Sequence, residues 1–151
     1  MASTPLASFK GGCLCGSVVY TVTGNPVASI VCLCTQCQTI AGGFGVGSVI
    51  VPKDSVAIEG GDLLVNFEMP GSSKGVIRRF CKVCGTHVFA SSPGHPVTAV
   101  HAGTLKEADR FQPQAVIWCQ SRRPYHRFSD DLPQFAQYPP APVPAAPAPS
   151  A

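Results

Sequence analysis

The chain has no long hydrophobic run and unusually few charged residues. None of its apolar segments approaches the 18 consecutive residues expected of a membrane-spanning helix. Charged residues make up 13% of its 151 residues, about half the usual share, and the formal net charge is +3. The sequence has no dense run of lysine or arginine. The composition therefore argues against a membrane protein and against a nucleic-acid-binding protein.

Other common signatures are missing as well. The opening residues, MASTPLASFKGG, have no apolar core of the kind found in secretory signal peptides. Glycine-rich nucleotide-binding fingerprints and a Ser–His–Asp hydrolase pattern are absent from the sequence. We therefore expect a cytoplasmic protein, in a reducing compartment where clustered cysteines bind metal more often than they form disulfides.

Cysteine is the residue that stands out. Seven of the eight cysteines fall in three tight clusters, which are Cys13 and Cys15, then Cys32, Cys34 and Cys37, and finally Cys81 and Cys84. C-x-C and C-x-x-C spacings bring two sulfurs close enough to bind one thiophilic ion. The clusters therefore predict zinc, with an iron–sulfur cluster or another soft metal as the alternative. A disulfide framework is the interpretation that a secreted chain would favour instead.

The first and third clusters are predicted to share a structural zinc ion. Each is followed directly by a glycine, Gly16 or Gly85, which relieves crowding where backbone N–H groups turn toward sulfur. Four thiolates from two distant hairpins would close the coordination sphere and staple the fold. The basic residues around the third cluster, Arg78, Arg79 and Lys82, are expected to offset the −2 charge of this site, with a phosphate-binding patch as the alternative.

The middle cluster is predicted to hold a second zinc ion with one coordination position open. Three thiolates leave zinc a poor Lewis acid for water but suit a fourth sulfur, which indicates chemistry on a thiol or a thiol adduct. The alternative is a closed site whose fourth ligand is a protein group such as His87, His101 or Cys119. When seven thiolates and two zinc ions are counted, the formal charge of +3 falls to zero. These patterns do not identify the proton-transfer residue.

Short, β-branched, alternating segments predict a mainly β domain of antiparallel strands with metal knuckles in its loops. The expected strands are residues 17–23, 27–31, 44–51, 63–69, 75–80, 87–91, 97–103 and 115–119. Helical signal is confined to a turn or two after Cys37 and a short turn at 106–110. We expect an N-terminal arm at residues 1–10, a zinc-binding domain at 11–136, and a disordered, proline- and alanine-rich tail at 137–151 without chemistry of its own.

The order of the cysteine clusters resembles that of a known family. Residues 12–16, 32–37 and 80–86 read GCLCG, CLCTQC and FCKVCGT. This arrangement is similar to that of the glutathione-dependent formaldehyde-activating enzyme and centromere protein V family. The downstream GTL at 103–105 and SDDLPQF at 129–135 are also similar to its C-terminal pattern. The resemblance covers nearly the whole chain before the expected tail.

The resemblance implies a small, tent-like β fold stapled by zinc, with a structural four-cysteine site and a second zinc ion on Cys32, Cys34 and Cys37. The founding activity of the family is the condensation of formaldehyde with glutathione to S-hydroxymethylglutathione, a carbon–sulfur lyase reaction written in reverse. One departure is Gln38, because many relatives carry a basic residue directly after the third cysteine of this cluster.

Two classes of function follow from these observations. The first is a zinc-dependent carbon–sulfur lyase whose partner is a small-molecule thiol or thiol adduct, with a same-fold lyase or isomerase on another small metabolite as its nearest variant. The second is a non-catalytic zinc module that binds another macromolecule. A solvent-reachable second zinc site with one non-protein ligand favours the enzyme, and a fully coordinated, buried zinc ion favours the module.

Overall fold

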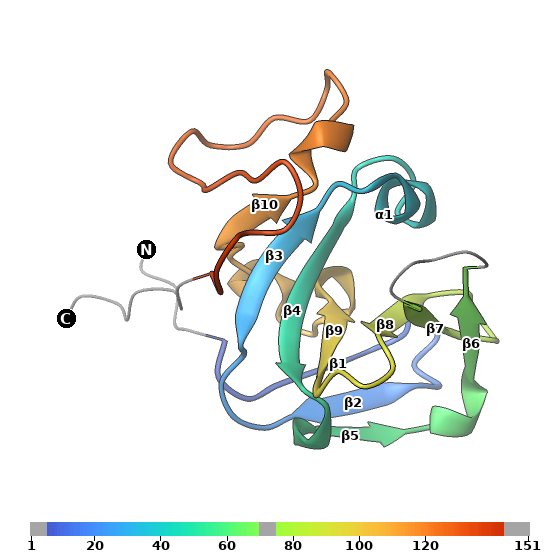
Figure 1. Cartoon of the computed structure of the whole chain (residues 1–151). Helices are drawn as coiled ribbons and strands as arrows, with labels where there is room; N and C mark the ends of the chain where they lie inside the picture. Colours follow the sequence, from blue (N-terminus) through green and yellow to red (C-terminus); the bar gives the residue numbers. More distant parts are fainter. Residues whose placement is uncertain (1–5, 70–74, 144–151) are drawn as a thin grey trace.

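The computed structural model describes residues 6–69 and 75–143, which form two β-sheets. The smaller sheet has the strand order β1-β2-β5 and is antiparallel throughout. Its strands are Phe9–Gly12 (β1), Val19–Val22 (β2) and Val56–Glu59 (β5). Figure 1 shows this sheet beneath the larger one.

The larger sheet has seven strands in the order β10-β3-β4-β9-β8-β7-β6. In chain order they are Ala28–Cys32 (β3), Val46–Pro52 (β4), Leu64–Glu68 (β6), Ile77–Cys81 (β7), His87–Ser91 (β8), Val97–His101 (β9) and Ala115–Ile117 (β10). Its strand pairs are antiparallel except for β10 and β3, which run parallel. This parallel pair brings the end of β10 beside the end of β3.

Helices are short and lie in the connections. The α-helix of the described residues, α1, spans Thr35–Ile40 and follows β3 directly. The 3-10 turns are Lys53–Ser55 (η1), Gly61–Leu63 (η2), Ala102–Thr104 (η3), Ala108–Arg110 (η4) and Cys119–Ser121 (η5). None of the helices in the described ranges has both the length and the apolar character needed to cross a membrane.

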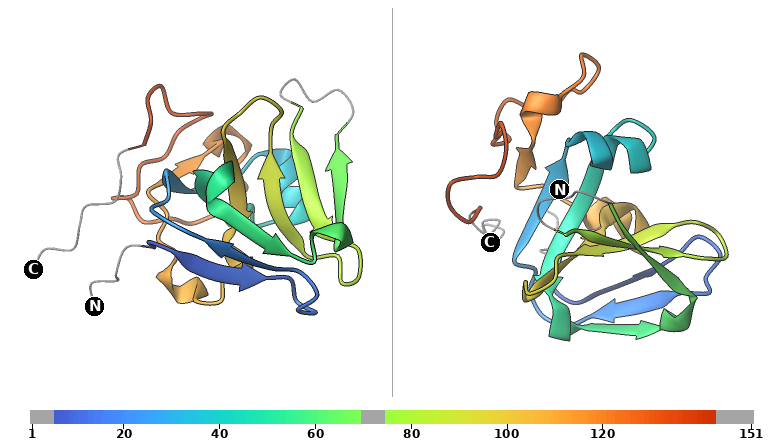
Figure 2. Two further views of the ribbon diagram at one scale, coloured as in Figure 1. Left: turned by 90° about the horizontal axis from the view of Figure 1, so that it is seen from below. Right: turned by 45° about the vertical axis from the view of Figure 1, so that its right-hand side comes forward.

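The hydrophobic core lies between the two sheets, which Figure 2 shows as two layers. Tyr20 of β2 meets Phe9 of β1 and Phe89 of β8 edge-on, with ring centroids 6.4 and 5.2 Å apart. Val49 of β4 and Val100 of β9 are fully buried against the same cluster. Because side chains alternate along each strand, these residues share the inner face of their sheets.

The mainly β prediction is confirmed, and each of the eight expected strands overlaps a strand of the structure. Strands β1 and β5 were not expected. The sequence of β1 is FKGG, whose two glycines disfavour a strand, so it depends on pairing with β2. The helix begins at Thr35 rather than after Cys37, because Cys34 acts as its N-cap.

Both ends of the described chain contact the body of the domain. Leu6 and Phe9 are buried in the core, so the described part of the expected N-terminal arm packs against the sheets. At the other end, the Gln137 carbonyl oxygen accepts a hydrogen bond from the Trp118 N–H at 3.2 Å. The rest of the expected tail, residues 144–151, lies outside the described residues.

Candidate metal centres

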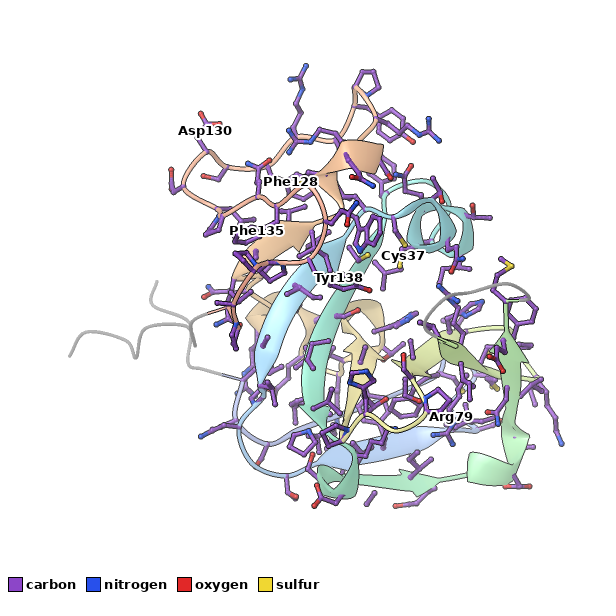
Figure 3. All side chains as sticks on the ribbon, in the orientation of Figure 1. Cys37, Arg79, Phe128, Asp130, Phe135 and Tyr138 are labelled. Atoms are coloured by element: carbon purple, nitrogen blue, oxygen red, sulfur yellow. The ribbon has the colours of Figure 1, made fainter. Side chains whose placement is uncertain are left out.

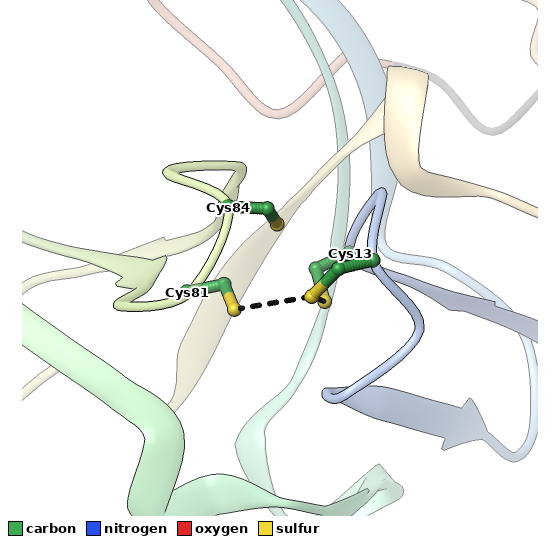
Figure 4. A group of neighbouring side chains, drawn as sticks. Cys13, Cys81 and Cys84 are labelled. Atoms are coloured by element: carbon green, nitrogen blue, oxygen red, sulfur yellow. Dashed lines mark hydrogen bonds between the residues drawn. The ribbon is translucent and has the colours of Figure 1, made fainter.

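The first and third cysteine clusters meet at one point between the sheets. Cys13 and Cys15 lie in the turn between β1 and β2, whereas Cys81 ends β7 and Cys84 lies in the turn after it. Their four sulfurs lie within 4.8 Å of one another. The Cys13 and Cys15 sulfurs are 3.5 Å apart, and those of Cys15 and Cys81 are 3.9 Å apart. Figure 4 shows the sulfurs of the two turns facing each other.

This spacing fits one tetrahedral ion. Sulfurs bound at about 2.3 Å in a tetrahedron lie about 3.8 Å apart, which is close to the observed separations. All eight cysteines are free thiols, so the disulfide interpretation is not supported. One turn belongs to the smaller sheet and the other to the larger sheet, and an ion bound here would fasten the two sheets together.

Both turns depend on a glycine in the left-handed conformation. Gly16 has φ of 77° and Gly85 has φ of 75°. Their N–H groups donate to the carbonyl oxygens of Cys13 and Cys81 at 3.0 and 2.8 Å. A Cβ atom at either glycine would meet nothing within 4 Å. The requirement for glycine is therefore conformational, and the crowding expected from the sequence is not its cause.

The middle cluster forms at a strand–helix junction. Cys32 is the last residue of β3, Cys34 is the N-cap of α1, and Cys37 lies in the first turn. The Cys37 N–H donates to the Cys34 Sγ atom at 3.4 Å. Leu33 is fully buried and anchors the junction. The three sulfurs lie within 4.8 Å of one another and each cysteine is half-buried, so the cluster is partly accessible.

The three thiols of this cluster resist losing all of their protons at once. Hydrogen bonds with Cys32 and Cys37 lower the pKa of Cys34 to about 2. Hydrogen bonds with Cys34 and Cys37, together with burial, raise the pKa of Cys32. One thiolate is thus stabilised at the expense of its neighbours. A divalent cation in place of the shared protons removes this conflict, so the donor set fits zinc.

Within the described residues, the middle cluster brings together three metal-ligating side chains. Cys119 is not one of them, and its Sγ atom donates to the Val116 carbonyl oxygen at 3.7 Å. His87 and His101 stack on each other instead, with ring centroids 6.2 Å apart and 15° between the ring planes. The described residues therefore do not support a closed site completed by one of these three side chains.

Arg78 of β7 connects the larger sheet to the three-cysteine cluster. Arg78 is 5% exposed, and its Nη2 atom donates to the Gln36 Oε1 atom on α1 at 2.7 Å. Its Nη1 atom is buried and has no hydrogen-bond partner among the described residues. Its positive charge favours the thiolate forms of Cys34 and Cys37. A buried guanidinium thus stands close enough to balance negative charge on the thiolates.

The structure places Arg78 beside the three-cysteine cluster, whereas the sequence led us to expect it near the four-cysteine site. Neighbouring residues on a strand point to opposite faces, so only one of the two adjacent arginines can face α1. Arg78 does so, whereas the Arg79 guanidinium lies over the Phe89 ring, 5.5 Å from its centroid. The spacing along the sequence could not distinguish the two faces.

Two histidines lie close to Arg78 and are held neutral. Burial, together with the charges of His87 and Arg78, lowers the pKa of His101 to about 4. Burial and the charge of Arg78 also lower the pKa of His87. Both imidazoles are therefore uncharged at pH 7.

Gln38 joins α1 to the C-terminal part of the chain. Its Nε2 atom donates to the carbonyl oxygens of Leu33 and Ser121 at 2.6 and 2.7 Å. Its Oε1 atom accepts a hydrogen bond from the Arg123 Nε atom at 3.2 Å. Gln38 itself is buried. The position after Cys37 therefore has a guanidinium beside it, although the cation comes from a residue far along the chain.

Two aromatic residues near the three-cysteine cluster carry no sequence signal for a site. Trp118 directly follows β10, and Tyr138 lies in the segment expected to be a tail without chemistry. Burial raises the pKa of Tyr138, and the charges of all three cysteines of the cluster raise it further. Figure 3 shows Tyr138 and Cys37 in the upper part of the molecule, near the end of β3.

The sequence and the fold both relate this chain to known proteins. Residues 8–121 match the family model of the glutathione-dependent formaldehyde-activating enzyme, which covers most of the chain. The chain therefore belongs to the glutathione-dependent formaldehyde-activating enzyme family, as its cysteine order indicated. A crystal structure of a Rhodobacter sphaeroides protein is similar with a TM-score of 0.53 and 19% identity, covering 65% of this chain and 88% of that one. This second likeness shows a shared fold.

Three curated relatives come from fungi. A Podospora anserina protein, provisionally named glutathione-dependent formaldehyde-activating enzyme, is 32% identical over 125 residues, which cover 76% of this chain and 57% of that protein. Proteins of Aspergillus flavus and Aspergillus oryzae with the same provisional name are 31% identical over 117 residues, covering 72% of this chain and 60% of each relative. The chain thus spans less than two thirds of the length of the curated relatives it matches.

Proposed function

We propose that the protein is a zinc-dependent carbon–sulfur lyase acting on the thiol adduct of a small carbonyl compound, with glutathione and formaldehyde as the first substrates to test. The observation that carries this proposal is the half-buried cluster of three cysteines for which the described residues supply no fourth metal ligand. Family membership supports the choice of substrates. The two cysteine groups support two zinc ions per chain, one structural and one at the reacting site.

A zinc ion on the three-cysteine cluster would offer its open position to a substrate thiol and favour the thiolate form of that thiol. The Arg78 guanidinium balances the single negative charge that three thiolates leave around a divalent ion. Buried Leu33 and Gln38 hold the strand–helix junction, so the three sulfurs keep their spacing when substrate arrives. The chain thereby supplies both a fixed donor set and a countercharge.

The charge around the cluster supports an anionic thiol such as glutathione. Arg123 is exposed, and its guanidinium is hydrogen-bonded to Gln38, the residue after Cys37. Arg122 is exposed beside it. Cations within a Debye length of about 8–10 Å attract carboxylates in solution. These two arginines are therefore the groups we expect to meet the carboxylates of glutathione.

The proposal is tested by asking whether the sulfur position of the substrate binds zinc, with selenium in place of that sulfur. The selenol analogue of glutathione keeps the shape of the thiol and gives an X-ray absorption signal that cysteine does not. We expect zinc–selenium coordination in the zinc-loaded wild type and in Cys119→Ser, because Cys119 lies outside both metal-ligating groups. Cys34→Ser should lose that signal while it keeps the zinc ion of the four-cysteine site.

Turnover is measured with carbon-13-labelled formaldehyde. Formation of the S-hydroxymethyl adduct should be faster with zinc-loaded protein and glutathione than with glutathione alone, and Cys34→Ser should fall to the uncatalysed rate. Selenol coordination without turnover would redirect the search to another carbonyl substrate of the same site. Absence of zinc–selenium coordination with any selenol would reject the lyase and favour the non-catalytic zinc module.

A further inference from the structure

Three parallel elements end at the same edge, beside the three-cysteine cluster. Strand β3 ends at Cys32, and β10 ends at Ile117, which is the parallel partner of Cys32. Residues 133–137 lie along the other side of β10, where Gln134 is the parallel partner of Val116. Backbone hydrogen bonds of 2.8 and 2.9 Å join Val116 to Pro133 and Phe135, and one of 3.2 Å joins Trp118 to Gln137. Because of this register, the residues that come next, Trp118 and Tyr138, lie at the edge of the sheet beside the cluster.

Trp118 is held in a strained conformation at this edge. Its φ of 61° places a bulky residue in the left-handed region, which costs roughly 1–3 kcal/mol. Its ring meets the Tyr138 ring edge-on, with centroids 5.5 Å apart and 83° between the planes. The ring contact places Tyr138 beside Trp118 at this edge of the sheet.

Tyr138 combines solvent access with closeness to the thiols. Tyr138 is 50% exposed, so the residue is in contact with solvent. A tyrosine phenol carries its proton at neutral pH. Figure 3 shows Tyr138 and Cys37 in the same region of the molecule. A protonated phenol in this place is a hydrogen-bond and proton donor.

Other polar groups around the cluster are less suited to exchange a proton with water. His101 is buried, and the Nδ1 atom of His87 is buried without a hydrogen-bond partner among the described residues. Arg78 is also buried, and a guanidinium keeps its proton in proteins. Tyr138 has both a transferable proton and contact with solvent.

We propose that Tyr138 is the proton donor of the reaction, a role that rests on the function proposed above. As the substrate sulfur bonds to the carbonyl carbon, the electron pair of the carbon–oxygen π bond moves to oxygen. That oxygen takes the proton of the Tyr138 hydroxyl. The phenolate recovers a proton from water, which balances the proton that the thiol released to solution when it ionised.

The test compares two tyrosines of similar exposure. Tyr138→Phe removes only the proposed donor hydroxyl, and Tyr125→Phe removes the hydroxyl of a residue that is 53% exposed and donates to the Gly43 carbonyl oxygen. We expect Tyr138→Phe to lower kcat for adduct formation by about 100-fold, or to the uncatalysed rate, with KM for glutathione unchanged. Tyr125→Phe should keep the wild-type kcat.

A second measurement needs no turnover. Trp118 is the single tryptophan of the chain, so its fluorescence reports on this edge of the sheet. Glutathione added to the zinc-loaded protein should change the emission of the wild type and of Tyr138→Phe with the same half-saturation concentration. The reason is that the hydroxyl acts on the carbonyl oxygen and not on the thiol.

Each outcome decides the inference. A Tyr138→Phe variant with wild-type kcat overturns it and leaves the proposed lyase intact. A variant whose glutathione affinity falls in step with its activity also overturns it, because the hydroxyl would then position the thiol. A wild-type protein that neither binds glutathione nor forms adduct removes the proposed function, and this inference with it.

Discussion

Loss of one cysteine should destabilise the protein more at the four-cysteine site than at the three-cysteine cluster. Cys81 is fully buried, and its sulfur is 3.9 Å from that of Cys15, a residue 66 positions earlier. A zinc ion that joins them closes a long loop and ties the smaller sheet to the larger one. The cluster that contains Cys34 is local, because its ligands lie within one strand–helix junction. Cys81→Ser should therefore cost more stability than Cys34→Ser.

The size of the difference follows from loop closure. In the chain-entropy model, a cross-link that closes a 66-residue loop contributes about 4 kcal/mol at 25 °C. The same model gives about 2 kcal/mol for the loop of about five residues between Cys32 and Cys37. We expect Cys81→Ser to lower the free energy of unfolding by about 4 kcal/mol and Cys34→Ser by at most about 2 kcal/mol.

The assay is urea unfolding of zinc-loaded protein under reducing conditions, paired with metal analysis of the same samples. Wild type should carry about two zinc ions per chain, and Cys34→Ser should be folded with about one. Cys119→Ser is the control, because its sulfur belongs to neither metal-ligating group, and it should retain both ions.

Two results would refute this reasoning. Equal losses of stability in Cys81→Ser and Cys34→Ser would show that the four-cysteine site does not stabilise the fold by cross-linking the two sheets. Freshly reduced wild type with far less than one zinc ion per chain, and with disulfides in place of thiols, would reject metal binding at both clusters.

Two further predictions concern the groups around the three-cysteine cluster. Arg78→Met should weaken zinc binding at this cluster by about 10- to 100-fold, because it removes the balancing charge and the link to α1. Arg79→Met, on the opposite face, should leave zinc affinity unchanged. Competition with a zinc chelator measures the affinity of both variants, and equal affinities would contradict the role assigned to Arg78. The pKa of His101 is lowered to about 4, so unfolding takes up a proton between pH 6.5 and 4. The free energy of unfolding therefore decreases as the pH is lowered through that window. His101→Asn should remove about 2 kcal/mol of the stability difference between pH 7 and pH 5, as measured by urea unfolding, and an unchanged difference would contradict a buried neutral imidazole.

Local spacing explains why the cysteines that could hold a metal ion were recognisable in the sequence. Cys13 and Cys15 are two positions apart, and so are Cys32 and Cys34, so each pair stays close in almost any fold. Glycines that follow the first and third clusters marked the turns correctly, since only glycine takes a φ near 75° without strain. The expected strands were likewise found, because alternation of buried and exposed side chains is a local pattern.

Partners that come from distant segments could not be read in the same way. Arg78 and Arg79 are adjacent and chemically identical, and only the register of β7 decides which of them faces α1. Strand β1 exists through its pairing with β2, because the sequence FKGG has little strand preference of its own. Gln38 acquires the Arg123 guanidinium as a neighbour only when the C-terminal segment folds back over α1.

The sequence by itself thus determined the family and the two groups of cysteines that could hold a metal ion, because both depend on cysteines close together along the chain. The tertiary structure decided what surrounds the three-cysteine cluster. The parallel pairing of β10 with β3, and of residues 133–137 with β10, carries Tyr138 from an apparently inert tail to the edge where Cys32 lies. Strand register over such distances is set by packing of the whole domain, and no local pattern encodes it.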